Sequence, residues 1–219
     1  MQKERQPADE TRPTPVAGVR GRPRVFDRDR ALAEATRLFW RKGYEATSIA
    51  DLTQAMGVGT TSLYAAFGSK DALYAEALQH YVDTYGDLAL GRFRAAATAR
   101  EAASAYLLDS AAVLTGSVPD LPRGCMATLA TVSSEGHEAL ADVVRLNRLG
   151  GFHMLRDRFA RGVDQGDLPP TTDVSGLATF IQTVQSGMSI LARDGADRAA
   201  LERAAEIALC GWDRFVDGA

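Results

Sequence analysis

The stretch "GVGTTSLYAAFGSKDAL", residues 57–73, interrupts long Ala-, Leu- and Arg-rich segments with glycines, small hydroxyls and aromatic side chains. Gly59 and Gly68 bound eight residues that predict a short helix, since glycine is common at helix ends. Leu63 and Phe67 lie one turn apart and predict its buried face. The opposite face then carries only threonines, a serine and alanines. Such a slim helix fits the major groove of DNA, where hydroxyls bond base edges and methyl groups contact thymine.

Two segments before this stretch predict the helices that support it. The first begins at Asp27 or Asp29, which suit an N-cap, and ends at Gly43. The second begins at Thr47, another suitable N-cap, and ends at Gly57, which allows the backbone to turn. Four apolar residues are spaced to pack the second helix on the third: Leu52, Met56, Val58 and Leu63. This order of elements is typical of a helix-turn-helix motif.

The predicted DNA contacts extend to both sides of the slim helix. Tyr64 and Lys70 are expected to reach flanking phosphates, Lys70 from the start of the next helix, where the helix dipole favours phosphate. Residues 1–24 are rich in proline and charge and predict a disordered arm, which is either a solvated tail or a minor-groove contact. Thr47 can offer its backbone N–H to a phosphate. The candidate DNA-binding residues are Arg24, Thr47, Thr60, Thr61, Ser62, Tyr64 and Lys70.

The charge distribution agrees with DNA contact at one end of the chain. The whole chain carries a net charge of −3. Residues 1–70 hold 12 basic and 8 acidic residues, a net +4, whereas residues 71–219 hold 13 and 20, a net −7. A basic end on an acidic body is expected where only one end meets phosphate.

Residues 31–74, "ALAEATRLFWRKGYEATSIADLTQAMGVGTTSLYAAFGSKDALY", resemble the N-terminal domain of TetR-family transcriptional regulators. The likeness extends over about residues 24–75. It implies an all-α homodimer with an N-terminal DNA-binding domain and a C-terminal ligand-binding domain. It also implies a repressor that a small, largely apolar ligand releases from a palindromic operator; an activator is the alternative within the family.

Three positions depart from the pattern of the family. Thr53 stands where Ala is usual, Gly59 where a capping Ser is usual, and Ala66 where His is common. Losing the cap hydroxyl at Gly59 costs about 0.5 kcal/mol, because Gly is only slightly worse than Ser as an N-cap. Ala66 leaves base contact to Thr60 and Thr61. The operator sequence therefore cannot be copied from a relative.

The rest of the chain is predicted to be helical, so the expected fold is all-α. Helices are expected from about residue 70, and over residues 100–115, 138–163, 173–193 and 197–216. We expect three parts: the disordered arm (1–24), a helix-turn-helix domain (25–70) and a ligand-binding and dimerisation domain (71–219).

The last two predicted helices have wide apolar faces and small residues that allow close helix contact. Two such helices can form half of an intersubunit four-helix bundle, and a two-fold dimer matches a palindromic operator. The alternative is that these faces pack only within their own subunit. The candidate interface residues are Leu177, Ile181, Leu191, Leu201, Ala205, Ala208, Leu209 and Trp212.

The middle helices supply side chains for an effector pocket, although each of them can also be ordinary core. His153 lies four residues before Asp157, a spacing that suits an ion pair, a ligand contact or a metal. The candidate ligand-binding residues are Phe93, Tyr106, Cys125, Met126, Leu129, Phe152, His153, Phe180, Val184 and Met188.

The two cysteines have different surroundings in the sequence. Cys125 lies in "LPRGCMATLATVSSEG", residues 121–136, which faintly resemble a TetR-family branch with a Gly-Cys pair. A neighbouring Arg123 can lower the pKa of the thiol, so a redox- or electrophile-sensing regulator is an alternative to a buried, inert Cys125. Cys210 lies in an apolar helix and is predicted to be core.

Motifs of other protein classes are missing from the sequence. The three histidines lie far apart, without metal-binding spacing or a phosphate-binding glycine loop, so no catalytic residue, metal or cofactor is predicted. No membrane span, apolar signal segment or disulfide framework is found, which predicts a reduced, cytoplasmic protein. A helical adaptor without DNA binding remains the alternative outside the regulator class.

Overall fold

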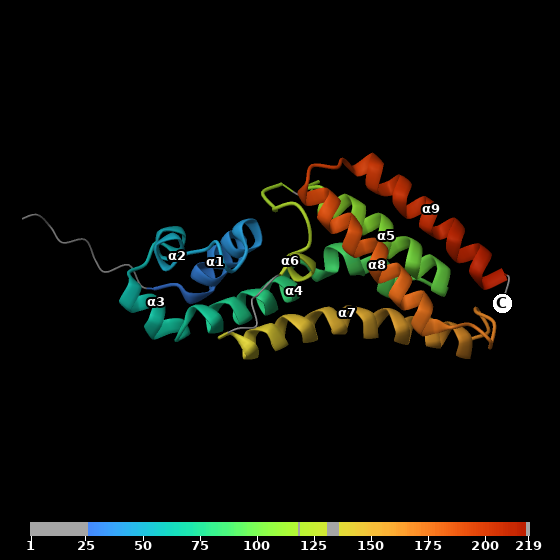
Figure 1. Cartoon of the computed structure of the whole chain (residues 1–219), viewed down its shortest axis with the longest axis horizontal. Coiled ribbons are helices and arrows are strands. Elements are labelled where there is room, and N and C mark those ends of the chain that lie inside the picture. The colour runs from blue at the N-terminus through green and yellow to red at the C-terminus, as the bar shows by residue number, and fades with distance from the viewer. Residues whose placement is uncertain (1–25, 118, 131–135, 218–219) are drawn as a thin grey trace, which may run out of the picture.

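The computed structural model describes residues 26–117, 119–130 and 136–217, and these residues form helices and loops without a strand (Figure 1). The all-α prediction is confirmed. The predicted arm, with Arg24, lies outside the described residues. The helices in the described part are α1 (Arg28–Lys42), α2 (Ile49–Met56), α3 (Thr60–Phe67), α4 (Lys70–Ala95), α5 (Ala99–Leu114), α6 (Met126–Leu129), α7 (Glu138–Asp164), α8 (Val174–Arg193) and α9 (Arg198–Asp217).

Helices α1–α3 form one end of the molecule, here called the head (residues 26–69), and its helix ends follow the predicted signals. The Asp27 side chain accepts a 3.0 Å hydrogen bond from Arg30 N at the start of α1. Gly57, with φ 67°, makes the turn between α2 and α3. One predicted cap is wrong: Ser48 precedes α2, because Ser48 and Asp51 each accept a hydrogen bond from the backbone N–H of the other.

The body is built from α4, α5 and α7–α9. Helix α4 starts beneath the head and packs on both α1 and α5, so it joins the two parts (Figure 1). Helix α7 packs on α8, and α5 packs on α8 and α9. The short α6, which the sequence did not predict, contacts α4, α7 and α8 near the head.

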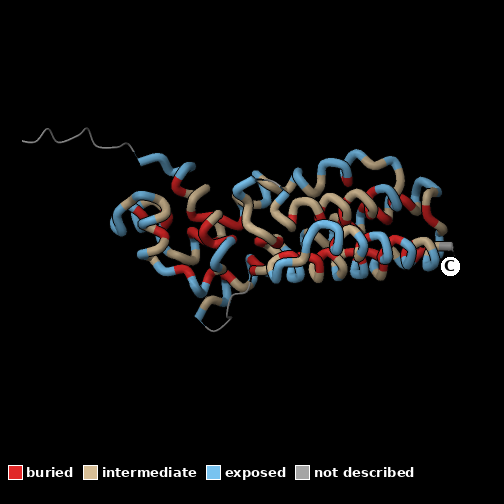
Figure 2. Tube along the Cα trace, turned by 90° about the horizontal axis from the view of Figure 1, so that it is seen from above, coloured by how far each residue is buried: buried red, intermediate tan, exposed pale blue. Residues whose placement is uncertain are grey.

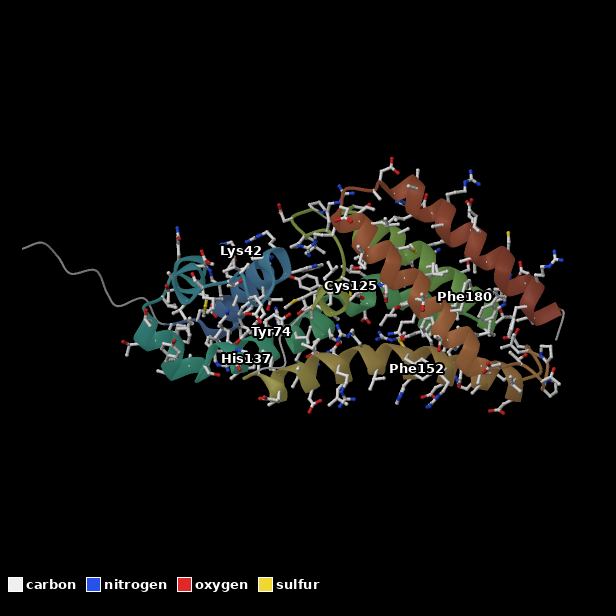
Figure 3. All side chains as sticks on the ribbon, viewed as in Figure 1. Lys42, Tyr74, Cys125, His137, Phe152 and Phe180 are labelled. Atoms are coloured by element: carbon white, nitrogen blue, oxygen red, sulfur yellow. The ribbon has the colours of Figure 1, made fainter. Side chains whose placement is uncertain are left out.

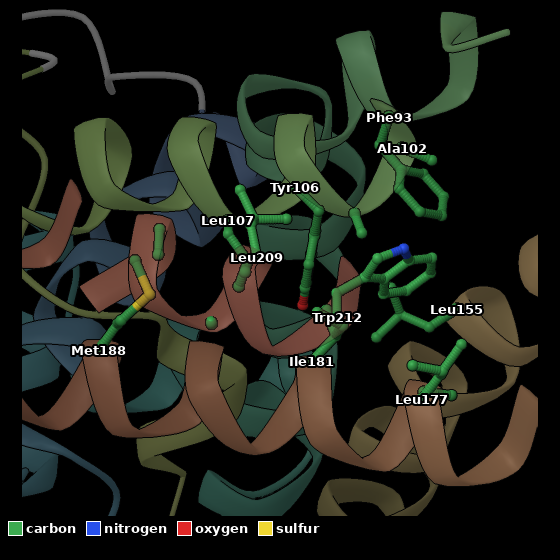
Figure 4. Packing of buried hydrophobic residues seen from close by; sticks show 14 of the residues in the cluster. Phe93, Ala102, Tyr106, Leu107, Leu155, Leu177, Ile181, Met188, Leu209 and Trp212 are labelled. Atoms are coloured by element: carbon green, nitrogen blue, oxygen red, sulfur yellow. The ribbon is translucent and has the colours of Figure 1, made fainter. Parts of the chain in front are cut away.

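Two apolar cores stabilise this arrangement, and Figure 2 shows buried residues along the inside of both parts. The bundle core lies chiefly among α5, α7, α8 and α9 and includes Leu107, Ile181 and Trp212 (Figure 4). The head core includes Leu52 and Leu63 and continues into α4, α6 and the start of α7. The head core therefore crosses the domain boundary expected at residue 70. Each fully buried Leu or Ile in the two cores contributes about 1.5–3 kcal/mol to the stability of the fold, because its side chain is removed from water.

Several residues that the sequence places in an intersubunit interface lie inside the subunit itself. Seven of the eight candidates are buried in the bundle core, and only Leu191 is exposed, at 50%. The apolar periodicity of α8 and α9 is satisfied mainly by α5 and α7, which a sequence alone does not reveal. Cys210, predicted to be core, is exposed. Among the described helices, none is long and apolar enough to span a membrane.

Candidate nucleic-acid interface and internal cavity

Helix α3 presents the small residues of its outer face to solvent. Thr60, Thr61 and Ser62 are exposed, and Tyr64 is 44% exposed. Leu63, on the inner face, is fully buried in the head core. Apart from Tyr64, the side chains that α3 exposes are those of threonine, serine and alanine, so the helix keeps the slim profile that a major groove accommodates.

The guanidinium of Arg28, at the start of α1, connects the end of α3 to α4. Arg28 donates to both carboxylate oxygens of Glu76, at 2.9 and 2.7 Å, and its guanidinium lies 4.5 Å from the centroid of the Phe67 ring. These groups are solvent-accessible, so the pair adds little to the free energy of unfolding. Its effect is to orient α3 relative to the first turns of α4.

A polar cluster beside α3 joins the head to the start of α7. The Tyr44 hydroxyl donates to Asp71, and His137 Nδ1 lies 2.8 Å from Asp71 Oδ2. The hydrogen bond from Tyr44, then the one with His137, holds the pKa of Asp71 below its usual value. Burial, followed by the Asp71 contact, raises the pKa of Tyr44. Lys70 Nζ lies 4.1 Å from the centroid of the Tyr44 ring, so its cation is positioned at the foot of α3.

Thr47 does not offer the phosphate contact that the sequence suggests. Its side chain is fully buried, and its hydroxyl donates to Gly43 O at 2.6 Å. Its backbone N–H donates to Tyr44 O at 3.2 Å. Both donors are therefore used within the head, because Ser48 takes the position of the N-cap.

A cavity of about 420 Å³ lies in the body, bounded by α4, α5, α7 and α8, with α6 at one side. Two of the ten predicted ligand-binding residues, Tyr106 and Cys125, line it. Its apolar walls come chiefly from α4, α5 and α7. Lining residues that were not among the ten include Tyr81, Tyr85, Leu90, Arg94, Ser110, Val113, Leu114, Asn147, Arg148, Met154, Gln182 and Gln185. The polar members gave no periodic signal in the sequence, because they converge from four helices.

The other eight predicted residues do not line this cavity. Phe93, Val184 and Met188 belong to the bundle core, and Met126 belongs to the head core. Leu129 is half-buried outside the lining. Phe152 and Phe180 line two surface grooves, both farther from the head than Cys125 (Figure 3). The groove at Phe152 lies between α7 and α8 and shares Arg148, Gln182 and Ser186 with the cavity, and the groove at Phe180 lies between α8 and α9. His153 is exposed, and the side chain of Asp157 pairs with Arg156 instead of His153.

Cys125 occupies the end of the cavity nearest the head. The Tyr81 hydroxyl donates to Cys125 Sγ at 3.3 Å, and Cys125 N donates to Ser189 Oγ at 2.8 Å. Burial, followed by the neighbouring thiol, raises the pKa of Tyr81, so this phenol stays protonated and remains a donor. Arg123, expected to act on the thiol, donates instead to Ala196 O.

The cavity and the head are joined by one indole. Trp40, near the end of α1, donates from Nε1 to Gly124 O at 2.8 Å. Its ring also packs edge-to-face on Tyr81, with centroids 4.7 Å apart. Gly124 immediately precedes Cys125, so the segment that carries the thiol is hydrogen-bonded directly to α1 of the head.

Comparison with known proteins agrees with this architecture. The family model "Bacterial regulatory proteins, tetR family" matches residues 31–77. The HTH-type transcriptional repressor ComR of Escherichia coli (strain K12) is 36% identical over 203 residues, 92% of this chain and 96% of that protein. The HTH-type transcriptional repressor BdcR of the same organism is 47% identical over 66 residues, 30% of this chain and 34% of that protein.

A solved structure extends the likeness to three dimensions. A cysteine mutant of the TetR family transcriptional regulator CifR, complexed with 26-bp double-strand operator DNA, has 42% sequence identity and a TM-score of 0.80. The match covers 86% of this chain and 98% of that chain. With a relative this similar over nearly its whole length, the chain belongs to the TetR family and is a helix-turn-helix transcriptional regulator, not an enzyme.

Proposed function

We propose that the chain is a homodimeric repressor that leaves a palindromic operator when a small, largely apolar molecule enters the cavity. The observation that carries the proposal is the hydrogen bond from Trp40 to Gly124, which joins the cavity wall to the head. ComR is named a repressor, and CifR is seen on operator DNA. The exposed hydroxyls of α3 support the same role here.

DNA reading is assigned to the outer face of α3 and its neighbours. Thr60, Thr61 and Ser62 are placed to meet base edges, with Tyr64 and Lys70 at flanking phosphates. Two heads of a two-fold dimer then enter successive major grooves about 34–36 Å apart. Any ligand that changes this separation lowers the affinity of both heads at once.

The dimer face is assigned to the apolar side chains that the subunit leaves uncovered on α8 and α9. Phe180, Ile190, Leu191, Ile207 and Phe215 are between 40% and 66% exposed. Apolar surface of this kind is typical of an interface, because its burial against a second copy removes it from water. Gly211 lies beside the Phe180 ring, which allows α8 and α9 to approach each other at this face.

Release of DNA follows from differential binding. A molecule in the cavity contacts Tyr81 and Cys125, and the displacement of this wall is transmitted through Gly124 to Trp40 and α1. The ligand shifts the population of heads away from the DNA-bound spacing only by the difference between its affinities for the two states.

The first experiment is selection of operator DNA. Fragmented genomic DNA is incubated with the purified protein and with Tyr64→Ala/Lys70→Ala, and the retained fragments are sequenced. Arg203→Ala, on the exposed side of α9, is the matched control. We expect one short palindrome that the control retains and the double variant loses. The affinity of Lys70→Ala for this palindrome is expected to depend less steeply on salt concentration, by the contribution of about one phosphate contact per head. No enrichment of any sequence by the wild type over the double variant contradicts the assignment and favours an adaptor, whereas retention of the same palindrome by both moves the DNA contacts away from Tyr64 and Lys70.

Whether the protein represses or activates transcription is tested separately, with a reporter gene placed downstream of the selected palindrome. A repressor lowers reporter transcription when it is supplied, and loss of Tyr64 and Lys70 restores transcription. Higher transcription on supplying the protein identifies an activator instead. Both results are read without knowledge of the effector.

A second candidate for the trigger is the thiol of Cys125, because its sulfur lines the cavity and accepts the Tyr81 hydroxyl. With iodoacetamide as a probe, a carbon–sulfur bond forms, iodide leaves and the thiol proton passes to solvent. Thiol sensing predicts that alkylation releases the operator from wild type and from Cys210→Ser, but not from Cys125→Ser. Release that is equal in all three proteins excludes it.

A further inference from the structure

We propose that the cavity takes an amphipathic acid, with a carboxylate or similar oxyanion bound at Arg148 and an apolar body among the side chains of α4 and α5. This inference rests on the proposed function, in that it takes the cavity as the effector site. It concerns the chemical class of the molecule that binds there.

The charge of the cavity wall is the first observation. Two guanidinium groups line the cavity, Arg94 and Arg148, and none of the described lining residues is Asp or Glu. Arg94 is neutralised by Asp87. Arg148 has no carboxylate partner among the residues that the structure describes, whereas Arg145 and Arg156 on the same helix pair with acidic side chains.

The position of Arg148 is set before any ligand binds. Its Nη1 donates to Ala130 O at 2.9 Å, and its backbone carbonyl accepts a 2.9 Å hydrogen bond from Gln182 Nε2 on α8. One nitrogen is thus engaged, and the other guanidinium donors remain for an oxyanion. A guanidinium fixed in this way favours carboxylate geometry and disfavours a cationic ligand.

A buried hydroxyl without a partner supplies the second observation. Ser110 on α5 lines the cavity and is 1% exposed, and its Oγ has no hydrogen-bond partner among the described residues. A buried polar atom without a partner is unfavourable, so its presence on a cavity wall points to a ligand that completes the hydrogen bond. An oxygen-bearing ligand accepts this hydrogen bond.

The remaining walls determine the rest of the molecule. Leu90, Val113, Leu114 and Met154 provide apolar contact, and a cavity of about 420 Å³ has the size of a small-molecule site. A short apolar body with one acidic group satisfies both the apolar walls and the unpaired cation.

The test compares three probes with one skeleton: 4-phenylbutyrate, 4-phenylbutan-1-ol and 4-phenylbutylamine. Binding to the full chain is measured by titration calorimetry. We expect the carboxylate to bind about tenfold tighter than the alcohol, as one charge-assisted pair supplies, and the amine to bind most weakly. Arg148→Gln is expected to remove the preference for the carboxylate and to leave the affinity for the alcohol unchanged. Arg148→Lys is expected to retain part of the preference. Ser110→Ala is expected to lower the affinity for the carboxylate and for the alcohol alike.

Arg145→Gln is the matched control, because Arg145 lies one turn away on the same helix and pairs with Asp142. Arg145 and Arg148 both line the surface groove between α7 and α8, but only Arg148 also lines the cavity. Thermal denaturation of each variant verifies that it folds. The proposal is overturned if the three probes bind with equal affinity or if the carboxylate does not bind. It is also overturned if Arg145→Gln changes carboxylate affinity as much as Arg148→Gln does. Operator release is measured in parallel with binding. If the carboxylate binds through Arg148 but does not release the operator, the proposed function is contradicted and the present inference stands. If only the uncharged probe releases the operator, the present inference is contradicted and the proposed function stands.

Discussion

The guanidinium of Arg193 donates to the backbone carbonyl of Trp40 at 2.7 Å and to that of Arg41 at 2.9 Å. The last residue of α8 thereby satisfies carbonyls in the final turn of α1. Burial lowers the pKa of Arg193, yet the group remains charged at neutral pH. Helix α8, which carries part of the exposed apolar face, is therefore hydrogen-bonded directly to α1 of the head.

Arg193→Met is expected to loosen this junction. The variant keeps most of the apolar side chain and loses two hydrogen bonds, so the free energy of unfolding falls by about 1–2 kcal/mol and operator affinity falls with it. Urea denaturation and a DNA-binding titration measure the two effects. Arg203→Met removes an exposed ion pair with Glu206 and is expected to change stability by less than about 0.5 kcal/mol. Equal stability of both variants contradicts a role for the Arg193 contact.

Trp40→Phe tests the link between cavity and head. It keeps an aromatic ring and leaves the buried carbonyl of Gly124 without its donor, at a cost of about 1–3 kcal/mol. We expect operator binding to persist and ligand-dependent release to weaken, as measured by fluorescence anisotropy of labelled DNA. Trp212→Phe, in the bundle core, is the matched control for loss of an indole. Unchanged release in Trp40→Phe means that the signal follows another route.

Gly124→Ala is expected to destabilise the protein by more than its backbone conformation alone requires. Gly124 has φ 80°, and a Cβ there lies 2.5 Å from Leu129 Cδ1 and 3.0 Å from Ser189 O. Gly166 has a similar φ of 76°, and a Cβ there has nothing within 4 Å. Gly166→Ala therefore measures the cost of the left-handed conformation, about 1 kcal/mol, and the additional loss in Gly124→Ala measures the clash. If both variants lose the same free energy of unfolding, Leu129 and Ser189 move to accommodate the added methyl group without an energetic cost.

Asp71 gives stability a dependence on acid pH. Its pKa is lowered in the folded protein, first by the Tyr44 hydroxyl and then by His137, whereas an unfolded Asp titrates near the ordinary value of about 3.9. The contribution is therefore present above that value and is lost as the pH falls through the lower, folded pKa. We expect wild type to exceed Asp71→Asn in Tm at neutral pH and the difference to vanish in acid. Asp142→Asn, at an exposed ion pair, is the control, and a difference that persists at low pH disproves the assignment.

The dimer face is tested with Ile207→Glu. Ile207 is 66% exposed on α9, so the change costs the free subunit little, but it places a charge in the proposed interface. Sedimentation equilibrium is expected to show a shift from dimer to monomer. Leu88→Glu, at a residue of α4 that is 42% exposed, should leave the mass unchanged. A dimeric Ile207→Glu variant locates the interface elsewhere.

The sequence by itself determined the helices and the DNA-reading motif of this protein. Gly43, Gly57 and Gly68 mark helix ends, and Leu52 and Leu63 mark the contact between α2 and α3, because both signals depend on neighbours within a few residues. The one misplaced cap, Thr47 for Ser48, differs by a single position. Either residue type suits an N-cap, and only the reciprocal bonds with Asp51 distinguish them.

Only the tertiary structure decided which apolar faces meet and which polar groups share the cavity. Apolar periodicity states that a face is buried but not by which neighbour, so Trp212 and Ile181 belong to the subunit core while Ile207 and Phe180 remain exposed. Ser110 and Arg148 are 38 positions apart and carry no common pattern. They line one cavity because α5 and α7 pack around it, and that packing depends on the shapes of whole helices rather than on the spacing of residues within one.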